Sequence, residues 1–199
     1  MHRKRISIGA GKNYRWAQTP RNKGGKAITL IELLRDKLQY ADNAREAREI
    51  LNNQLVYVDG KPVKDGKQAV GVMDVISLPQ IKTNYRLMPG KKNLELREIK
   101  DSQAKVKLCR VTGKKKLKKG KIQLALHDGS TLLYDKKAKV NDTILLTLPE
   151  RKVQKVLPFK KGSSVIIYHG RHSGEQGKLE DTLDGTQTRK SLSTVEGLQ

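Results

Sequence analysis

Residues 29–61 read TLIELLRDKLQYADNAREAREILNNQLVYVDGK. Apolar residues recur at helical spacing in 30–38 and again in 44–51, and this periodicity predicts two short amphipathic helices. The pattern changes to that of a strand from residue 55 onward. Because a strand pattern follows the second helix so closely, the segment predicts two helices packed on a small sheet, which is an α/β module.

Both helices are predicted to begin at a capping pair. Thr29 stands three residues before Glu32, and Asn43 stands three residues before Glu46. In such a capping box the first side chain and the Glu carboxylate three residues on are both expected to accept hydrogen bonds from free backbone amides at the start of the helix. The helices should therefore start just after Thr29 and just after Asn43.

The β part of the module is predicted to contain a hairpin. Residues 55–58 (LVYV) are followed by Asp59-Gly60, a dipeptide typical of two-residue turns, and then by 61–63 (KPV). Pro62 lacks an amide hydrogen, so its strand is expected to start there or to lie at an edge. A further strand is predicted over 71–78 (GVMDVISL).

The charge of the chain predicts a polyanionic partner. Among 199 residues there are 42 Lys and Arg against 20 Asp and Glu, a net charge of +22. A compact domain with such a surplus repels itself, whereas binding polyphosphate releases condensed counterions. No acid occurs in 1–27 or in 102–127, so both segments are expected to face nucleic acid, and the slightly acidic 175–199 to face solvent or a protein.

Composition also excludes several classes of protein. The single cysteine, Cys109, excludes an intramolecular disulfide framework, fits a reducing compartment and is expected to be a small buried strand residue. No apolar run approaches the ~20 residues of a membrane span. The basic start MHRKR is not followed by an apolar segment, so it is not a secretory signal. A soluble, cytoplasmic protein is expected.

The first 27 residues are predicted to form a flexible basic N-terminal arm. They contain glycines, prolines and basic residues with little apolar periodicity, so they cannot bury enough surface to order themselves. Trp16 either stacks on a nucleobase or packs the arm onto the next module. The basic residues expected to bind RNA there are Arg3, Lys4, Arg5, Lys12, Arg15, Arg21, Lys23 and Lys26.

After residue 90 the helical signal nearly vanishes, and short strands separated by turns predict a small barrel or sandwich. The predicted strands of this central domain, 91–158, are 105–111, 121–127, 131–134, 142–148 and 153–157. A third unit, 159–199, begins with an apolar run that leads into a stretch of spaced glycines.

The module at 28–90 resembles the S-four RNA-binding module, in which two helices and the adjoining loop present basic side chains to structured RNA. The resemblance rests on LLRDKL at 33–38, VYVDGK at 56–61 and GVMDVI at 71–76. It implies RNA contacts by Arg35, Lys37, Arg45, Arg48, Lys61 and Lys64. The alternative for this set is an ordinary solvated charged surface.

Residues 162–179 resemble the KOW motif, a strand–loop–strand element of small SH3-like barrels. The loop residues that carry the resemblance are Gly170, Arg171, Gly174 and Gly177. Glycine at these positions would let the loop adopt positive φ and approach another backbone closely. A C-terminal SH3-like barrel is therefore expected.

The order of these modules resembles the archaeal and eukaryotic S-four-e family of small-subunit ribosomal proteins over nearly the whole chain. The central segments that match are 107–111, 126–129 and 139–144. The resemblance implies an α+β fold with a barrel-like centre, and a structural constituent of the ribosome that is not an enzyme. Its partners would be small-subunit rRNA and neighbouring ribosomal proteins, with no cofactor, no metal and no membrane, and with a monomeric state off the ribosome.

This chain also departs from the family pattern. Residues 114–121 are unusually rich in lysine, and the chain stops at Gln199 without the longer C-terminal part of the eukaryotic members, which favours an archaeal member. Two other functions remain as alternatives. An RNA-modifying enzyme would need a separate catalytic domain, for which little sequence is left, and a KOW-type transcription or translation factor would bind only transiently.

Two histidine patterns have little support as reactive sites. His169 and His172 have a ligand-like spacing but no accompanying carboxylate cluster or second ligand pair. His127-Asp128 is followed by Gly129, so it is interpreted as a strand end entering a turn. Neither a phosphate-binding loop nor a nucleophile elbow occurs in the sequence.

Overall fold

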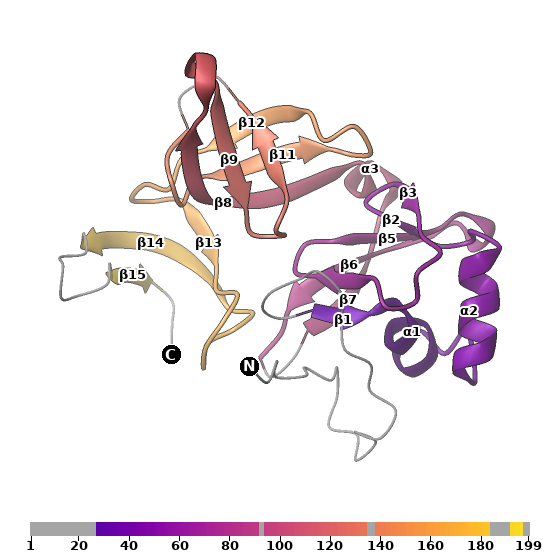
Figure 1. Ribbon diagram of the computed structural model, residues 1–199. Coiled ribbons are helices and arrows are strands. Elements are labelled where there is room, and N and C mark those ends of the chain that lie inside the picture. The colour runs from indigo at the N-terminus through magenta and orange to yellow at the C-terminus, as the bar shows by residue number, and fades with distance from the viewer. Residues whose placement is uncertain (1–26, 92–93, 135–137, 184–191, 197–199) are drawn as a thin grey trace, which may run out of the picture.

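The structure is a computed structural model that describes residues 27–91, 94–134, 138–183 and 192–196 (Figure 1). Antiparallel sheets dominate these residues, and helices occur mainly near the N-terminal end, which confirms an α+β protein. The arm predicted over 1–27 lies, except for Ala27, outside the described residues, and so do its eight basic residues and Trp16.

The first module contains both predicted helices. The first begins after Thr29 as α1 (Leu30–Glu32) and continues as the π-helix η2 (Leu33–Lys37), while Thr29 Oγ1 accepts from the Glu32 amide at 3.3 Å. The second is α2 (Ala44–Asn52), and the Asn43 side chain accepts from the amides of the first turn. Both predicted N-caps are therefore confirmed.

The predicted Asp59-Gly60 hairpin is also confirmed. Strand β2 (Tyr57–Val58) pairs with β3 (Lys61–Pro62), with Val58 opposite Lys61. Asp59 and Gly60 have φ of +52° and +76°, as the twist of a two-residue hairpin requires. Pro62 lies in the edge strand of its sheet, as predicted.

The single strand predicted over 71–78 is wrong. The segment divides into β4 (Ala69–Gly71), which pairs with β1 (Ala27–Thr29), and β5 (Val75–Leu78), which belongs to a different sheet. Between them Met73 has a φ of +68°, and the buried Asp74 carboxylate accepts from the Gly71 amide at 2.7 Å. The aspartate closes a tight turn, which apolar periodicity alone does not reveal.

The main sheet of the first module has the strand order β3-β2-β5-β6-β7. After the short 3-10 helix η3 (Pro79–Ile81), β6 (Thr83–Pro89) and β7 (Leu94–Ile99) form a hairpin, so the sheet continues past residue 90. Helices and sheet bury one apolar core. Its fully buried members include Leu30, Leu33, Leu34, Leu51, Val56, Val70, Ile76 and Leu87.

A short helix, α3 (Asp101–Ala104), leads into the central sheet, whose order is β10-β9-β8-β11-β12. Its strands are β8 (Val106–Lys116), β9 (Ile122–Leu126), β10 (Thr131–Leu133), β11 (Thr143–Thr147) and β12 (Val153–Leu157). All five predicted strands are present, but β8 continues past its predicted end at Val111. Among the described residues β10 and β12 do not pair, so the expected barrel is not closed. The first part of β8, up to Arg110, pairs with β11, and the part from Val111 onward pairs with β9. The pairing with β9 contains a register shift between Val111 and Gly113.

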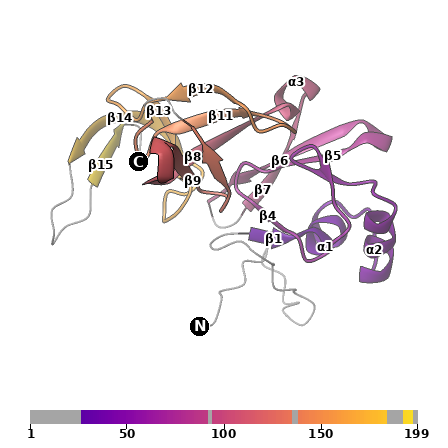
Figure 2. The same ribbon diagram turned by 45° about the horizontal axis from the view of Figure 1, so that its top comes forward.

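The C-terminal sheet contains β13 (Ser164–Ile166), β14 (Gln176–Leu183) and β15 (Leu192–Glu196) in that order. Its described strands form an open antiparallel sheet and not the expected SH3-like barrel. Figure 2 shows it beside the central sheet and on the side away from α2. No helix within the described residues is long and apolar enough to cross a membrane.

Candidate nucleic-acid interface

The exposed side of α2 presents two arginines of the predicted RNA-binding set. Ala47 and Leu51 are fully buried and fix the helix to the core, so Arg45 and Arg48 point to solvent. Neither guanidinium has a carboxylate partner among the described residues. Two unpaired guanidiniums on a rigid helix suit phosphate, because each offers a planar fork of donors.

Arg35 and Lys37 both lie in η2, but they differ in exposure and in how easily a phosphate can reach them. Arg35 is partly buried and its guanidinium contacts both carboxylate oxygens of Asp36, at 2.7 and 2.8 Å. This hydrogen bonding raises the pKa of Arg35. Lys37 is exposed. A phosphate could reach Lys37 directly but would have to compete with Asp36 for Arg35.

The remaining predicted residues of this module, Lys61 and Lys64, are also exposed. They lie in and just after β3, the edge strand that follows the Asp59-Gly60 turn. The structure therefore places five exposed cations, from η2, α2 and the edge hairpin, on one module. Those cations are Lys37, Arg45, Arg48, Lys61 and Lys64.

The loop between β13 and β14 has the backbone geometry predicted for it. Gly170 and Gly174 have φ of +105° and +95°. A Cβ on Gly174 would lie 2.8 Å from the Pro89 carbonyl oxygen, whereas one on Gly170 would meet nothing within 4 Å. Gly177 lies against the backbone of Glu196, and Arg171 is exposed. Gly174 therefore lets the C-terminal sheet pack against the β6–β7 turn of the first module.

A second contact connects the same loop to the central sheet. The Arg110 guanidinium lies 4.8 Å from the centroid of the Tyr168 ring and donates to the Tyr168 hydroxyl at 3.1 Å. His172 lies nearby in sequence, and its Nδ1 is 2.9 Å from Glu175 Oε2. No group of three or more potential metal ligands occurs within the part of the chain that the structure describes.

The His127 ring has a structural role at the boundary between modules. Its Nδ1 accepts from the Arg110 amide at 3.2 Å, and its Nε2 lies 3.1 Å from the Val72 carbonyl oxygen. A carbonyl only accepts, so the proton of the neutral ring is on Nε2. Burial lowers the pKa of His127. The ring thus joins the end of β9 to the β4–β5 turn.

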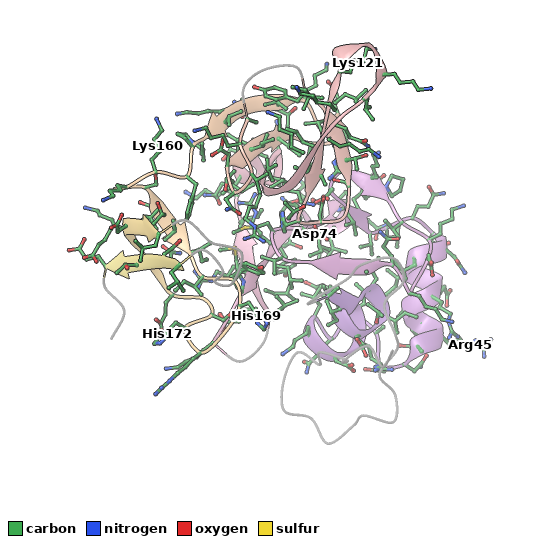
Figure 3. All side chains as sticks on the ribbon, turned by 60° about the vertical axis from the view of Figure 1, so that its left-hand side comes forward. Arg45, Asp74, Lys121, Lys160, His169 and His172 are labelled. Atoms are coloured by element: carbon green, nitrogen blue, oxygen red, sulfur yellow. The ribbon has the colours of Figure 1, made fainter. Side chains whose placement is uncertain are left out.

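The largest feature that the sequence did not predict is a buried ion cluster, the joint cluster. Lys107 in β8 has no exposed surface, and its Nζ donates to Asp59 at 2.5 Å, Asp74 at 2.6 Å and Asp128 at 3.2 Å. These contacts use all three donors of the ammonium. Arg151 also donates to Asp128 and completes the cluster. In Figure 3 Asp74 lies at the centre of the molecule.

Every acid of the joint cluster lies in a tight turn. Asp59 belongs to the β2–β3 turn and Asp74 to the β4–β5 turn, while Asp128 belongs to the β9–β10 turn. Asp59 also accepts from the Val75 amide at 3.1 Å. Two turns of the first module therefore meet one turn of the central sheet around the Lys107 ammonium.

Two groups of the joint cluster, Lys107 and Asp128, have shifted pKa values that favour their charged forms. Burial alone would lower the pKa of Lys107, but attraction to Asp74 and Asp59 outweighs it and raises the pKa above its usual value. Burial would raise the pKa of Asp128, yet Lys107 and hydrogen bonds from Ser130 hold it well below its ordinary range. Lys107 and Asp128 are therefore both ionised at neutral pH.

Two further contacts support the same boundary. Arg86 in β6 donates to the carbonyl oxygens of Gln103 and Val106 at 2.7 and 2.6 Å, although burial lowers its pKa. Gly60 approaches Pro149 so closely that an added Cβ would lie 3.0 Å from the proline Cβ. The first module and the central sheet are thus joined by ionic, hydrogen-bonded and close-packed contacts.

The expectation that 102–127 faces nucleic acid is wrong for Lys107, because its charge is neutralised inside the protein. A signal for this was present in the sequence. Side chains at alternate positions of a strand point to the same side, and Lys107 alternates in β8 with Cys109 and Val111. Both of these residues are fully buried. A lysine at an inward position between two modules needs buried carboxylates, and Asp59, Asp74 and Asp128 are turn residues that supply them.

Family models match both main parts of the chain. The S4 domain matches residues 32–76, and the model described as ribosomal family S4e matches residues 81–153. The first region contains α2 and the hairpin, and the second contains most of the central sheet. The joint cluster contains residues of both matches, because Asp59 and Asp74 lie in the first and Lys107 and Asp128 lie in the second.

Several proteins are similar over most of this chain. A small ribosomal subunit protein eS4 from Methanothermobacter thermautotrophicus is 41% identical over 174 residues, which is 85% of this chain and 72% of that protein. The one from Archaeoglobus fulgidus is 37% identical over 99% of this chain and 86% of that protein.

A solved structure has the same fold. The crystal structure of 30S ribosomal protein S4e from Thermoplasma acidophilum matches with a TM-score of 0.72 and 32% identity, covering 86% of this chain and 92% of that one. Sequence, domain order and fold agree, and the chain belongs to the ribosomal protein family S4e.

Proposed function

We propose that this protein is a structural constituent of the small ribosomal subunit that binds and stabilises folded rRNA. The observation that carries the proposal is the pair Arg45 and Arg48, exposed without carboxylate partners on a helix of the S4 domain. Lys37, Lys61 and Lys64 extend the same module with further exposed cations. Most contacts would go to phosphate and sugar, so the protein reads RNA shape and not base sequence.

The arm adds to this interface in the proposal. Its residues Arg3, Lys4, Arg5, Lys12, Arg15, Arg21, Lys23 and Lys26 carry positive charge without any acid nearby in sequence. Neutralising phosphates by both the arm and the S4 domain would release counterions and let RNA helices approach each other. The partners are small-subunit rRNA and neighbouring ribosomal proteins, and off the ribosome the protein is a monomer.

The finer organisation also belongs to this proposal. The functional units would be an arm at 1–27, an RNA-binding module that starts at 28 and whose sheet ends with β7 at Ile99, a central domain from there to 158 and a KOW-type module at 159–199. The positive φ of Gly170 and the close approach of Gly174 support a KOW-type loop. Arg171 at this loop would be its exposed basic residue.

The test is RNA binding by the full chain and by the double variant Arg45→Gln/Arg48→Gln. With small-subunit rRNA, the variant should bind about tenfold or more weakly, and the slope of affinity against salt should fall by about one per arginine removed. The charge-matched control Lys155→Gln/Lys178→Gln removes two exposed lysines elsewhere and should bind nearly as the natural protein does. Equal loss in both variants would refute a specific role for α2.

A second measurement separates this function from its alternatives. A stable constituent should cosediment with small subunits after a high-salt wash, whereas a KOW-type transcription or translation factor should wash off. Incubation with labelled rRNA should leave every base unmodified. Modified bases would instead support an RNA-modifying enzyme.

A further inference from the structure

Residues 114–121 form a lysine-rich hairpin that extends beyond the core of the central sheet. The inward alternation of β8 ends at Val111, and Lys114, Lys115 and Lys116 are all exposed. The amide of Leu117 donates to the Lys121 carbonyl at 2.8 Å and closes the tip. This lysine hairpin is Lys114, Lys115, Lys116, Lys118 and Lys121, with its tip helix η4 at Lys118–Gly120.

The charges of the lysine hairpin are not neutralised by the part of the protein that the structure describes. None of the five ammonium groups has a carboxylate partner among the described residues, and no acid occurs anywhere in 102–127. Lys114 donates to the Ala138 carbonyl at 3.0 Å, which fixes the base of the hairpin. Mutual repulsion among exposed lysines on two adjacent strands favours the binding of an external anion.

The lysine hairpin lies far from the arginines of the S4 domain. Figure 3 shows Lys121 at the top of the molecule and Arg45 at its lower right, with Asp74 of the joint cluster near the centre. The two basic surfaces belong to different family matches, since Arg45 lies in the S4 domain and Lys121 in the S4e region. Lys121 and Arg45 therefore lie on different parts of the molecule.

The connection between the two surfaces is rigid. Lys107 binds carboxylates from both modules, and the His127 ring bonds Val72 across the same boundary. Strand β8 itself runs from Lys107 in the joint cluster to Lys116 in the hairpin. A ligand bound at the hairpin is thus held at a fixed position relative to a ligand bound at α2.

We propose that the lysine hairpin is a second RNA-binding surface, which engages a separate A-form RNA helix while the S4 domain engages another. The proposal rests on the proposed function and deepens it, because the protein then acts as a rigid bridge between two RNA helices. Lysines on a narrow ribbon suit the phosphates that border the deep groove of A-form RNA, where point charges bind without reading bases.

The test uses the full chain and two short RNA duplexes, one with a donor dye and one with an acceptor dye. The natural protein should bring both duplexes together and give energy transfer that disappears at high salt. The variant Lys115→Gln/Lys116→Gln/Lys118→Gln/Lys121→Gln should still bind one duplex but lose energy transfer at least about tenfold. A matched control, Lys82→Gln/Lys100→Gln/Lys155→Gln/Lys178→Gln, removes four other exposed lysines and should retain the transfer.

The outcomes distinguish this inference from the proposed function. If the hairpin variant transfers energy as well as the natural protein, or if the control loses transfer equally, the bridge is refuted while RNA binding by the S4 domain stands. If the hairpin variant keeps both duplexes but no longer cosediments with small subunits, the hairpin contacts a protein and the inference is wrong. If the natural protein binds no duplex and no rRNA, the proposed function itself fails.

Discussion

The ammonium of Lys107 lies 2.6 Å from the carboxylate of Asp74, and neither side chain is exposed to solvent. Lys107 belongs to the central sheet, whereas Asp74 belongs to the first module. An ion pair inside one module stabilises that module alone, but this pair fixes the position of one module on the other. The orientation of helix α2 relative to the central sheet therefore depends on a buried charge.

Replacing Lys107 by Met should destabilise the protein strongly. The change removes the ammonium that three carboxylates share, and breaking a buried ion pair by removing one partner costs about 3–5 kcal/mol. Denaturant unfolding measures the effect. Lys155→Met removes an exposed lysine and should change the free energy of unfolding by less than about 0.5 kcal/mol. Similar stabilities for the two variants would mean that the joint cluster contributes little.

The stability of the protein should fall as the pH drops below the usual histidine pKa. Burial lowers the pKa of His127 below its ordinary value of 6.5, so in this pH range the unfolded chain binds a proton that the folded protein does not. The contribution is complete above pH 6.5 and decreases as the pH falls through that value. Unfolding free energies measured from about pH 7.5 to 5.5 show the slope.

Two variants identify the source of this pH dependence. His127→Gln should flatten the slope, because it removes the partly buried ring whose pKa is lowered. His169→Gln alters an exposed histidine and should keep the slope of the natural protein. An unchanged slope in His127→Gln would assign the pH dependence to other groups.

Local features of the fold could be predicted from the sequence because they depend on neighbouring residues. The caps at Thr29 and Asn43 and the Asp59-Gly60 turn involve residues close in the chain, and all three are confirmed. The break at Met73 could not be predicted, because 71–78 is rich in Val, Ile and Leu, which favours a strand, and the turn is fixed by a buried carboxylate. Apolar periodicity and strand propensity do not reveal a buried side-chain contact of this kind.

The candidate site shows the same division between local and long-range information. Exposure of Arg45 and Arg48 follows from the helical period of α2, so it could be predicted. The partners of Lys107 lie 48, 33 and 21 residues away in sequence, and no local pattern connects them. The absence of acids in 102–127 predicted that Lys107 lies at the surface. Its position on the buried side of β8 indicates instead that it lies in the interior.

Replacing Gly174 by Ala should destabilise the contact between the C-terminal sheet and the first module. The added Cβ would lie 2.8 Å from the Pro89 carbonyl oxygen, and backbone atoms cannot move away cheaply. Gly170→Ala is the matched control, because its φ is also positive but an added Cβ meets nothing within 4 Å. The control should lose about 1–3 kcal/mol from backbone strain alone, and Gly174→Ala should lose more.

Denaturant unfolding of the two glycine variants separates conformation from contact. A larger loss in Gly174→Ala, together with faster proteolysis of the C-terminal sheet, supports close packing against Pro89. Equal losses would show that only the positive φ matters and that the loop does not press on the first module.

Cys109 should react with thiol reagents only when the central sheet opens. Burial raises the pKa of its thiol to about 12, and the reactive species is the thiolate. Because Cys109 is the only cysteine in the chain, all labelling by a thiol-reactive disulfide reagent reports this one position. At pH near 8 the folded protein should label slowly, and the rate should rise with denaturant in parallel with unfolding.

Labelling of the Lys107→Met variant distinguishes opening of the central sheet from a change in the pKa of the Cys109 thiol. Removing the nearby cation takes away an attraction that lowers the pKa of Cys109, so the folded form of the variant should be even less reactive. Faster labelling of the variant in native buffer would therefore report more frequent opening of the central sheet and not a more acidic thiol. That result is expected, because β8 contains both Lys107 and Cys109 and loses its anchor on the first module. Slower labelling would show that the core around Cys109 stays closed without the joint cluster.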